Sequence, residues 1–172
     1  MSKAERLMSL PKILHFQDEQ ILTSAEMMEA VAYLFMEDIP FNKVLGLDIA
    51  LYTPERVELR FQKKEELIGN NLQKILHGGV TAAVLDTVGG LLAIRTLFQE
   101  MGECSYGTFL RRFSTIGTID MRVDYLRPGR GTEFVASAEI LRLGKKIAVC
   151  RMELHNEHRM QIAAATASYI VG

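Results

Sequence analysis

The sequence predicts an α+β domain in which an antiparallel β-sheet wraps around one long buried helix, with a further helix ahead of it. Three observations predict this class. A capped amphipathic helix precedes a hairpin, a long run that is apolar on every side follows it, and four β-like runs joined by short turns complete the chain. With 172 residues, 48% of them hydrophobic, the chain can bury one full core and is too short to need a second.

The first element is a helix expected from about Ser24 to Asp38. Thr23 and Glu26 have the spacing of a capping box, in which two residues bond each other's backbone N–H groups. Pro40 ends this helix, because proline has no N–H to donate, and Phe41 to Leu45 adds one short turn. Apolar residues recur at helical intervals along it: Met27, Met28, Val31, Leu34 and Phe35.

The strands are recognised by alternation and by the turns between them. Leu47 to Tyr52 and Arg56 to Phe61 are expected to form a hairpin with one buried and one wet face. Later strands are expected at Thr115 to Leu126, Glu133 to Leu143, Lys145 to Leu154, and Gln161 to Val171. Their short, turn-like connections favour an antiparallel meander.

Between these two groups, Gly78 to about Met101 is expected to be a buried helix, since it is rich in Ala, Leu and Val and too long for a strand. It is a poor membrane span, because its apolar run is shorter than the roughly 20 residues required and contains Asp86 and Gly89-Gly90. A helix that is apolar all round needs a second cover opposite the sheet, and a partner subunit is the economical one. Gly102 to Arg112 reads as a polar stretch.

Charge and cysteine content exclude several classes of function. A net charge of −1 does not favour a nucleic-acid or membrane-surface binder, because such proteins usually carry a basic excess. Cys104 and Cys150 lack a metal-like spacing and are expected to be reduced thiols, and the turn with His155 and His158 lacks metal-site partners, so no metal is expected. Met1 to Leu10 has no uninterrupted apolar region typical of a secretory signal, so we expect a cytoplasmic protein.

Three motifs carry a resemblance to a known family. Asn71-Leu-Gln-Lys-Ile-Leu-His77-Gly78-Gly79 is followed by Asp86 and then by Asp120-Met-Arg-Val-Asp-Tyr125-Leu126-Arg127-Pro128. In order and spacing they are similar to the hotdog-fold acyl-CoA thioesterases of the 4-hydroxybenzoyl-CoA thioesterase superfamily, in its PaaI-like branch. The resemblance implies acyl-CoA hydrolysis, no cofactor beyond the coenzyme A of the substrate, and a homodimer or dimer of dimers. It spans about residues 41–170, so we expect a helical extension over 1–40 and the hotdog domain over 41–172.

The resemblance also implies a role for each matching residue. Gly78 supplies a backbone N–H to the thioester oxygen, Asp86 is the base or nucleophile, and Asn71 lies near the reacting group. Thr118 takes the place of a hydroxyl that helps to orient water. The stretch from Gly102 to Ser114 departs from the family pattern as an insertion.

The chemistry of thioester hydrolysis fits these residues. It needs donors for the developing oxyanion and a base or nucleophile on the other side of the carbonyl carbon. Gly78 and Gly79 begin a helix, where N–H groups have no intrahelical partner and glycine lets an acyl group approach. Asp86 lies eight residues beyond Gly78, roughly 12 Å along the helix. We therefore expect two antiparallel helices, related by a twofold axis, to share two sites.

Less specific interpretations stay open for these residues. Asp86 can be a structural residue that bonds a neighbouring hydroxyl or amide, and His77 can order the preceding loop without transferring a proton. Asn71 can be a turn residue, and Thr118 can serve packing alone. Arg127 and Arg130 suit the phosphates of coenzyme A, whose oxygens match a guanidinium fork, or they form a solvated turn.

Two other functions also stay open. A hydroxyacyl-thioester dehydratase of the same fold requires a catalytic histidine that faces an acid across the dimer, which His77 and Asp86 would have to supply. A non-catalytic acyl-CoA sensor would retain Asp86 as a structural residue. The release of thiol from a panel of acyl-CoA esters separates the three functions. Serine-hydrolase chemistry is disfavoured because the chain has no Gly-x-Ser-x-Gly motif.

Overall fold

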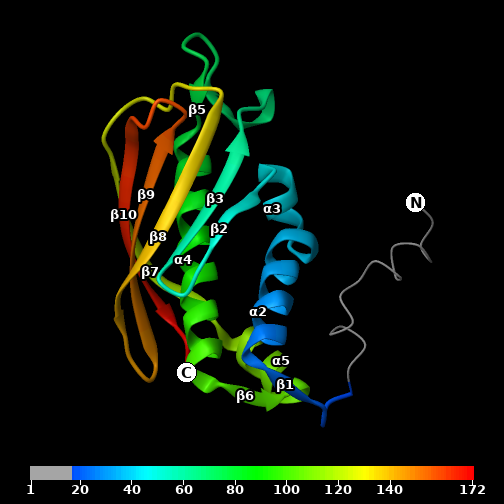
Figure 1. Ribbon diagram of the computed structural model, residues 1–172. Coiled ribbons are helices and arrows are strands. Elements are labelled where there is room, and N and C mark those ends of the chain that lie inside the picture. The colour runs from blue at the N-terminus through cyan, green and yellow to red at the C-terminus, as the bar shows by residue number, and fades with distance from the viewer. Residues whose placement is uncertain (1–16) are drawn as a thin grey trace, which may run out of the picture.

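The computed structural model describes residues 17–172, in which a six-stranded sheet curls around helix α4, Gly78–Met101 (Figure 1). All neighbouring strands are antiparallel, in the order β2-β3-β8-β9-β10-β7. The predicted fold class is confirmed, whereas the features predicted for Met1 to Leu10 lie outside the described residues. The strands are β2 Asp48–Tyr52, β3 Arg56–Gln62, β7 Gly117–Tyr125, β8 Glu133–Leu143, β9 Ile147–Asn156 and β10 Gln161–Ile170.

The predicted N-terminal helix is confirmed as α2, Ser24–Tyr33, which continues into a π-helical turn, η2, Leu34–Asp38. Its capping box is closed. The Glu26 N–H donates to Thr23 Oγ1 at 3.3 Å, and the Thr23 N–H donates to Glu26 Oε2 at 2.9 Å. The predicted further turn is α3, Pro40–Leu45, which ends at Gly46 with φ 69°, a left-handed conformation that favours glycine.

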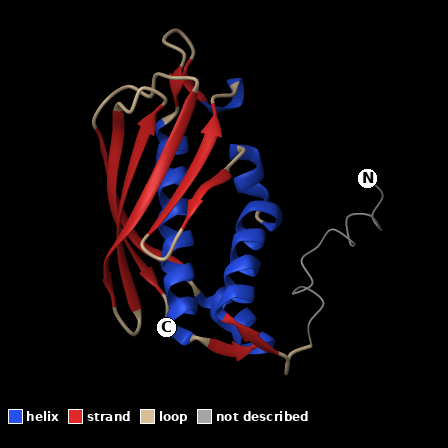
Figure 2. Ribbon diagram, in the orientation of Figure 1, coloured by secondary structure: helices blue, strands red, loops and turns tan. Residues whose placement is uncertain are grey.

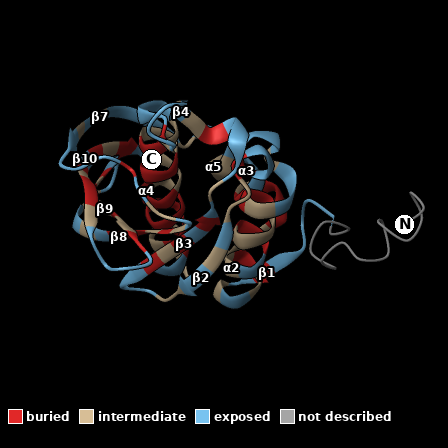
Figure 3. Ribbon diagram, turned by 90° about the horizontal axis from the view of Figure 1, so that it is seen from above, coloured by how far each residue is buried: buried red, intermediate tan, exposed pale blue. Residues whose placement is uncertain are grey.

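Helix α4 is covered on both sides by its own chain. The sheet lies against one side of α4 and α2 runs along another, and α3 lies past the C-terminal end of α2 (Figures 1 and 2). Met27, Ala30 and Val31 of α2 are fully buried, and the buried positions gather around α4 when the molecule is seen from above (Figure 3). We expected a partner subunit to provide this second cover, but α2 provides much of it.

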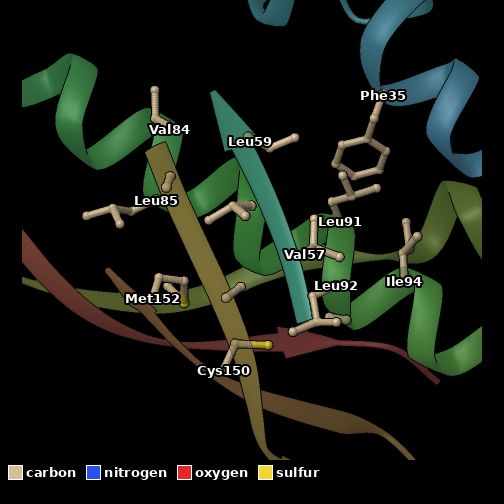
Figure 4. Close-up of a cluster of buried hydrophobic side chains, with 14 of the residues drawn as sticks. Phe35, Val57, Leu59, Val84, Leu85, Leu91, Leu92, Ile94, Cys150 and Met152 are labelled. Atoms are coloured by element: carbon tan, nitrogen blue, oxygen red, sulfur yellow. The ribbon is translucent and has the colours of Figure 1, made fainter. Parts of the chain in front are cut away.

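The core around α4 explains why so apolar a helix exists in this chain. Leu85, Leu91 and Leu92 of α4 pack against strand residues such as Val57 and Met152 (Figure 4). By length and composition α4 could cross a membrane, yet 61% of its most apolar window is buried inside the domain. The helix is apolar because the sheet and α2 surround it.

One prediction about the sheet is wrong, because β7 does not lie beside β8. We expected the last four strands to form a meander, but β7 pairs with β10 at one edge while β8 lies between β3 and β9. The loop from Arg127 to Gly131 therefore crosses the end of the sheet, held by the strands that it passes. The Leu126 N–H donates to Ile162 O at 2.9 Å, and Asn156 Nδ2 donates to Arg130 O at 2.9 Å.

The polar stretch from Gly102 to Arg112, for which no helix or strand was predicted, is folded. Strand β6, Glu103–Ser105, pairs with β1, Ile21–Thr23, and is followed by α5, Tyr106–Thr115. Tertiary ring contacts hold α5 in place: the ring centroids of Phe109 and Phe98 are 4.8 Å apart, and those of Phe113 and Phe35 are 6.1 Å apart. Helix α5 thus joins α4 to the N-terminal helices.

Three short elements lie between β3 and α4: η3 Glu65–Leu67, β4 Ile68–Asn70 and β5 Ile75–Leu76.

Candidate active site

Asp86 lies in the middle of α4, half-buried, and contacts strand β7. The Thr118 hydroxyl on β7 donates to Asp86 Oδ1 at 2.8 Å. The structure therefore brings together two residues that the sequence analysis named separately. A bond to one carboxylate oxygen leaves Oδ2 able to accept a proton from a water or to approach a substrate atom.

A β-bulge sets the direction of the Thr118 side chain. Met121 on β7 packs against the core, so strict alternation along the strand would turn Thr118 to the opposite face. The pairing with β10 shifts at this point, however: Ile119 has no partner in the register, and Thr118 pairs with Tyr169. Cross-strand partners face the same side of a sheet, and Tyr169 is buried against α4. The bulge at Ile119 therefore aims Thr118 at α4, as bulges beside functional sites often do.

A largely apolar pocket of about 270 Å³ opens beside Asp86 and Thr118. It is bounded by α4, β7 and β10 on one side and by η2, α3 and α5 on the other. Its apolar lining residues are Phe35, Ile39, Ile94, Phe113 and Ile116. Such a lining favours a hydrocarbon group. The N-terminal helices and α5, both outside the sheet, therefore complete the pocket.

Asn42 is a polar lining residue that the sequence analysis did not single out. It is only 4% exposed, and its Nδ2 donates to Phe35 O at 2.9 Å. The Thr87 hydroxyl, which follows Asp86 on α4, lies 3.5 Å from Asn42 Oδ1 and also contacts Ala83 O at 2.9 Å. Asn42 thus joins the corner between η2 and α3 to α4. The only sequence signal was a polar residue in a short apolar segment, which does not identify its partners.

The N-terminus of α4 offers one available glycine N–H. His77 is the N-cap residue, and its Nδ1 accepts the Gly79 N–H at 2.9 Å. A Cβ on Gly79 would lie 3.0 Å from that nitrogen and would crowd the ring. The Gly78 N–H, in contrast, makes no hydrogen bond within residues 17–172. Of the two glycine donors that the sequence suggested, Gly79 is engaged by the chain itself and Gly78 is open.

Strand β7 also contacts α4 at this end. The Tyr125 hydroxyl donates to Gly78 O at 3.0 Å, and a Cβ on Gly78 would lie 3.5 Å from the ring. The first turn of α4 contains no acidic residue, so no side chain of that turn neutralises the positive end of the helix dipole. A pocket of about 340 Å³ adjoins Gly78, with Tyr125, Leu126 and Arg127 in its lining. This end of α4 is therefore open to an anionic or strongly polarised group.

Asn71 lies in the exposed turn between β4 and β5. Its Oδ1 accepts a hydrogen bond from Lys74 Nζ at 2.6 Å. Among the described residues, none of its hydrogen bonds reaches Asp86, Gly78 or His77. The structure of one chain therefore does not bring Asn71 to the carboxylate.

Arg127 and Arg130 lie on the loop that crosses the end of the sheet. Arg127 Nη1 donates to Gln161 O at 2.9 Å, and Arg130 Nη2 donates to Gln73 Oε1 at 2.9 Å. Both line a surface pocket of about 340 Å³ together with His158. A guanidinium has five N–H donors, so these bonds leave others for a ligand.

Comparisons with known proteins show what this chain is similar to. The model of the thioesterase superfamily matches residues 73–163. The medium/long-chain acyl-CoA thioesterase YigI of Escherichia coli is 43% identical over 152 residues, which cover 88% of this chain and 98% of that protein. The crystal structure of a Shewanella oneidensis protein related to the thioesterase superfamily superposes with a TM-score of 0.82 at 50% identity, covering 87% of this chain and 97% of that one.

A more distant structure shows the fold alone. The PaaI protein of Escherichia coli, from the phenylacetic acid degradation operon, has a TM-score of 0.69 at 18% identity, with 87% of this chain and 96% of that chain covered. The family match covers the segment that contains Gly78, Asp86 and Thr118. By its sequence and by its sheet wrapped around a central helix, this chain belongs to the thioesterase superfamily and has the hotdog fold.

Proposed function

We propose that this protein hydrolyses acyl-CoA thioesters to the free acid and coenzyme A, with Asp86 as general base or nucleophile. The observation that carries the proposal is the Asp86 carboxylate, held by Thr118 at 2.8 Å beside an apolar pocket. The relative YigI is named for medium and long acyl chains. The hydrocarbon-like lining of this pocket supports the same substrate class here.

As a general base, the Asp86 carboxylate takes a proton from a water molecule whose oxygen attacks the thioester carbonyl carbon. The carbon–sulfur bond then breaks, and the coenzyme A thiolate leaves and takes up a proton. As a nucleophile, Oδ2 attacks the same carbon and the carbon–sulfur bond breaks, which gives an anhydride and the coenzyme A thiolate; the thiolate takes up a proton, and water then hydrolyses the anhydride. In both routes the carbonyl oxygen becomes negative, and the Gly78 N–H at the positive end of α4 stabilises it.

The site is proposed to be shared between two copies of the chain. Gly78 and Asp86 are eight residues apart on one helix, a separation of roughly 12 Å, so they cannot meet at one carbonyl. Strand β7 lies at an edge of the sheet and contacts α4 at both places, through Thr118 and through Tyr125. Two β7 edges that pair antiparallel around a twofold axis would bring Asp86 of each copy towards Gly78 of the other. The edge carries exposed apolar side chains that such pairing would cover, Ile119 at 53% and Tyr125 at 57% exposure.

Binding of the nucleotide end of coenzyme A is assigned to Arg127 and Arg130. Both lie at the end of the sheet towards which the N-terminus of α4 points, and Arg127 lines the pocket beside Gly78 as well. A phosphate there would be bound by guanidinium groups and the acyl group by the apolar pocket. A substrate of this kind belongs to the cytoplasm, where we place the protein.

The geometry at His77 disfavours the dehydratase alternative. A dehydratase histidine must face its substrate as an acid or base, whereas Nδ1 of His77 accepts the Gly79 N–H and caps the helix. The non-catalytic sensor differs from the proposed enzyme in that the wild-type protein would bind acyl-CoA esters without hydrolysing them.

The decisive experiment measures thiol release from acyl-CoA esters of increasing chain length by the wild type, Asp86→Asn and Asp86→Ala. We expect both variants to lose a factor of about 10² to 10⁴ in kcat, the usual contribution of a positioned base. Asp48→Asn is the matched control, since Asp48 is an exposed carboxylate on the far edge strand, β2, and accepts a hydrogen bond from Arg60. Wild-type turnover in both Asp86 variants would refute the proposal, and a wild-type protein that binds acyl-CoA esters without hydrolysing them would favour the sensor.

A further inference from the structure

The hydroxyl of Tyr169 reaches the backbone of the residue to which the chemistry is assigned. Tyr169 lies near the end of β10, its side chain is 1% exposed, and its Oη donates to the carbonyl oxygen of Asp86 at 3.1 Å. We propose that Tyr169 is a positioning residue for Asp86, an inference that rests on the proposed function of that carboxylate. Tyr169 would hold the backbone of Asp86 while Thr118 holds its side chain.

The sequence of α4 leaves room for this contact. Gly89 and Gly90 follow Asp86 by about one turn, in the interior of a helix where each glycine costs about 0.5–1 kcal/mol relative to alanine. A Cβ on Gly89 would overlap the Tyr169 hydroxyl, and a Cβ on Gly90 would lie 3.6 Å from its ring. Gly89 therefore has a structural reason: it lets the tyrosine approach the helix closely enough to bond Asp86, whereas a Cβ on Gly90 would make only an ordinary contact.

The sheet register places the two supports of Asp86 side by side. Tyr169 on β10 pairs with Thr118 on β7, immediately beside the bulge at Ile119. Two neighbouring strands thus contact one residue of α4, one at its carbonyl oxygen and one at its carboxylate. A catalytic group must be held within about 0.5 Å of its productive position, and one bond to a side chain does not fix the backbone beneath it.

Tyr169 acts as a donor and does not transfer a proton in this scheme. Burial raises the pKa of Tyr169 well above its usual value, and the nearby negative charge of Asp86 raises it further. The phenol therefore stays protonated at any pH at which the enzyme works. The Tyr169 ring also lines the pocket beside Asp86, but loss of the hydroxyl alone should lower the rate of the chemical step and change substrate binding little.

The test is Tyr169→Phe, which keeps the ring in the space that Gly89 provides and removes only the hydroxyl. We expect kcat to fall about three- to tenfold, the effect of one buried hydrogen bond, with KM changed less than about twofold. Tyr52→Phe is the matched control, because the Tyr52 hydroxyl donates to a helix carbonyl, Met28 O, at 3.2 Å and lies outside the Asp86 pocket. The kcat of Tyr52→Phe should stay at the wild-type value even if its Tm falls as much as that of Tyr169→Phe.

A double-mutant cycle with Thr118→Val separates positioning from general loosening. If both residues act through Asp86, the combined loss in kcat should be smaller than the product of the two single losses. A wild-type kcat for Tyr169→Phe, an equal loss in Tyr52→Phe, or losses that multiply fully would overturn the inference. Any of these results together with an inactive Asp86→Asn leaves the proposed function standing, whereas an active Asp86→Asn would remove both.

Discussion

Helices α2 and α4 both begin at a capping residue, but they treat the positive end of the helix dipole differently. In α2 the cap Thr23 is joined by Glu26, whose carboxylate lies in the first turn and accepts the Thr23 N–H at 2.9 Å. In α4 the side chain of the cap His77 accepts the Gly79 N–H, and the first turn contains no acidic residue. The start of α2 is therefore neutralised within its own first turn, whereas the first turn of α4 has no acidic residue to do the same.

This difference distinguishes a helix end that serves stability from one that is available for chemistry. A capping box satisfies local donors with local acceptors, so nothing else is required at that surface. At α4, glycine in place of a side chain exposes the Gly78 N–H beside a pocket. An incoming carbonyl oxygen that gains negative charge is the complement of such an end.

The largest expected effect comes from removing the open donor with Gly78→Pro. Proline is well tolerated at the first position of a helix, and His77 already has the extended backbone, φ −66° and ψ 137°, that a residue before proline prefers. The fold should persist while the N–H is lost, so we expect activity to fall about a hundredfold or more. Gly78→Ala is the control: it keeps the N–H, and its Cβ would make an ordinary contact with Tyr125.

Mixing two inactive variants turns the same substitution into a test of the shared site. Co-expressed Gly78→Pro and Asp86→Asn chains that pair at random should recover about a quarter of wild-type activity, because half of the dimers are mixed and each has one intact site. A site contained within one chain would give no recovery. Co-purification through two different affinity tags confirms that mixed dimers have formed.

An intermediate effect is expected at His77, where the roles of cap and base can be separated. His77→Ala removes the side-chain acceptor for the Gly79 N–H and should cost about 1 kcal/mol of stability, with a severalfold loss of activity. Asparagine is a strong N-cap residue but cannot act as a base, so His77→Asn should recover most of both. Urea unfolding and thiol release are measured on each variant. An inactive but stable His77→Asn protein would assign proton transfer to His77.

Much of the fold could be predicted because its elements carry local signals. The bounds of α4 and of β8 agree with those predicted, since an apolar run without a polar face and a strand between turn residues are both readable in one dimension. Helix α5 was not predicted. Its segment reads as polar, although Ser105 caps it and Phe109 and Phe113 have helical spacing. Its contact with the Phe35 ring on η2, which is distant in sequence, has no local signal.

The candidate site was likewise predictable only in part. Asp86 and Thr118 were predicted because the family resemblance implies a role for each, and the structure joins them by a hydrogen bond. The bulge at Ile119 that makes this bond possible has no signal in a run of strand-forming residues. The contact of Tyr169 with the Asp86 carbonyl was equally hidden, although Gly89-Gly90 marked the place on the helix where something approaches closely.

The smallest expected effect is at the start of α2, where the capping box is closed, in Glu26→Gln. Hydrogen bonds from the Thr23 backbone and hydroxyl hold the pKa of Glu26 below its ordinary 4.5, so the charged form stabilises the folded state above that pH. This contribution is lost as the pH falls below 4.5 and through the lower pKa of the folded protein. Glutamine still accepts a hydrogen bond but does not titrate, so Tm should fall by no more than about 2 °C at pH 7, and the difference from wild type should vanish in acid.

Glu29→Gln, which removes a charge from the same helix outside the capping box, is the control. Activity per folded molecule should be unchanged in both, because a dipole that the chain already neutralises has no part in the reaction. A change in kcat for Glu26→Gln would show that the start of α2, too, acts on the site.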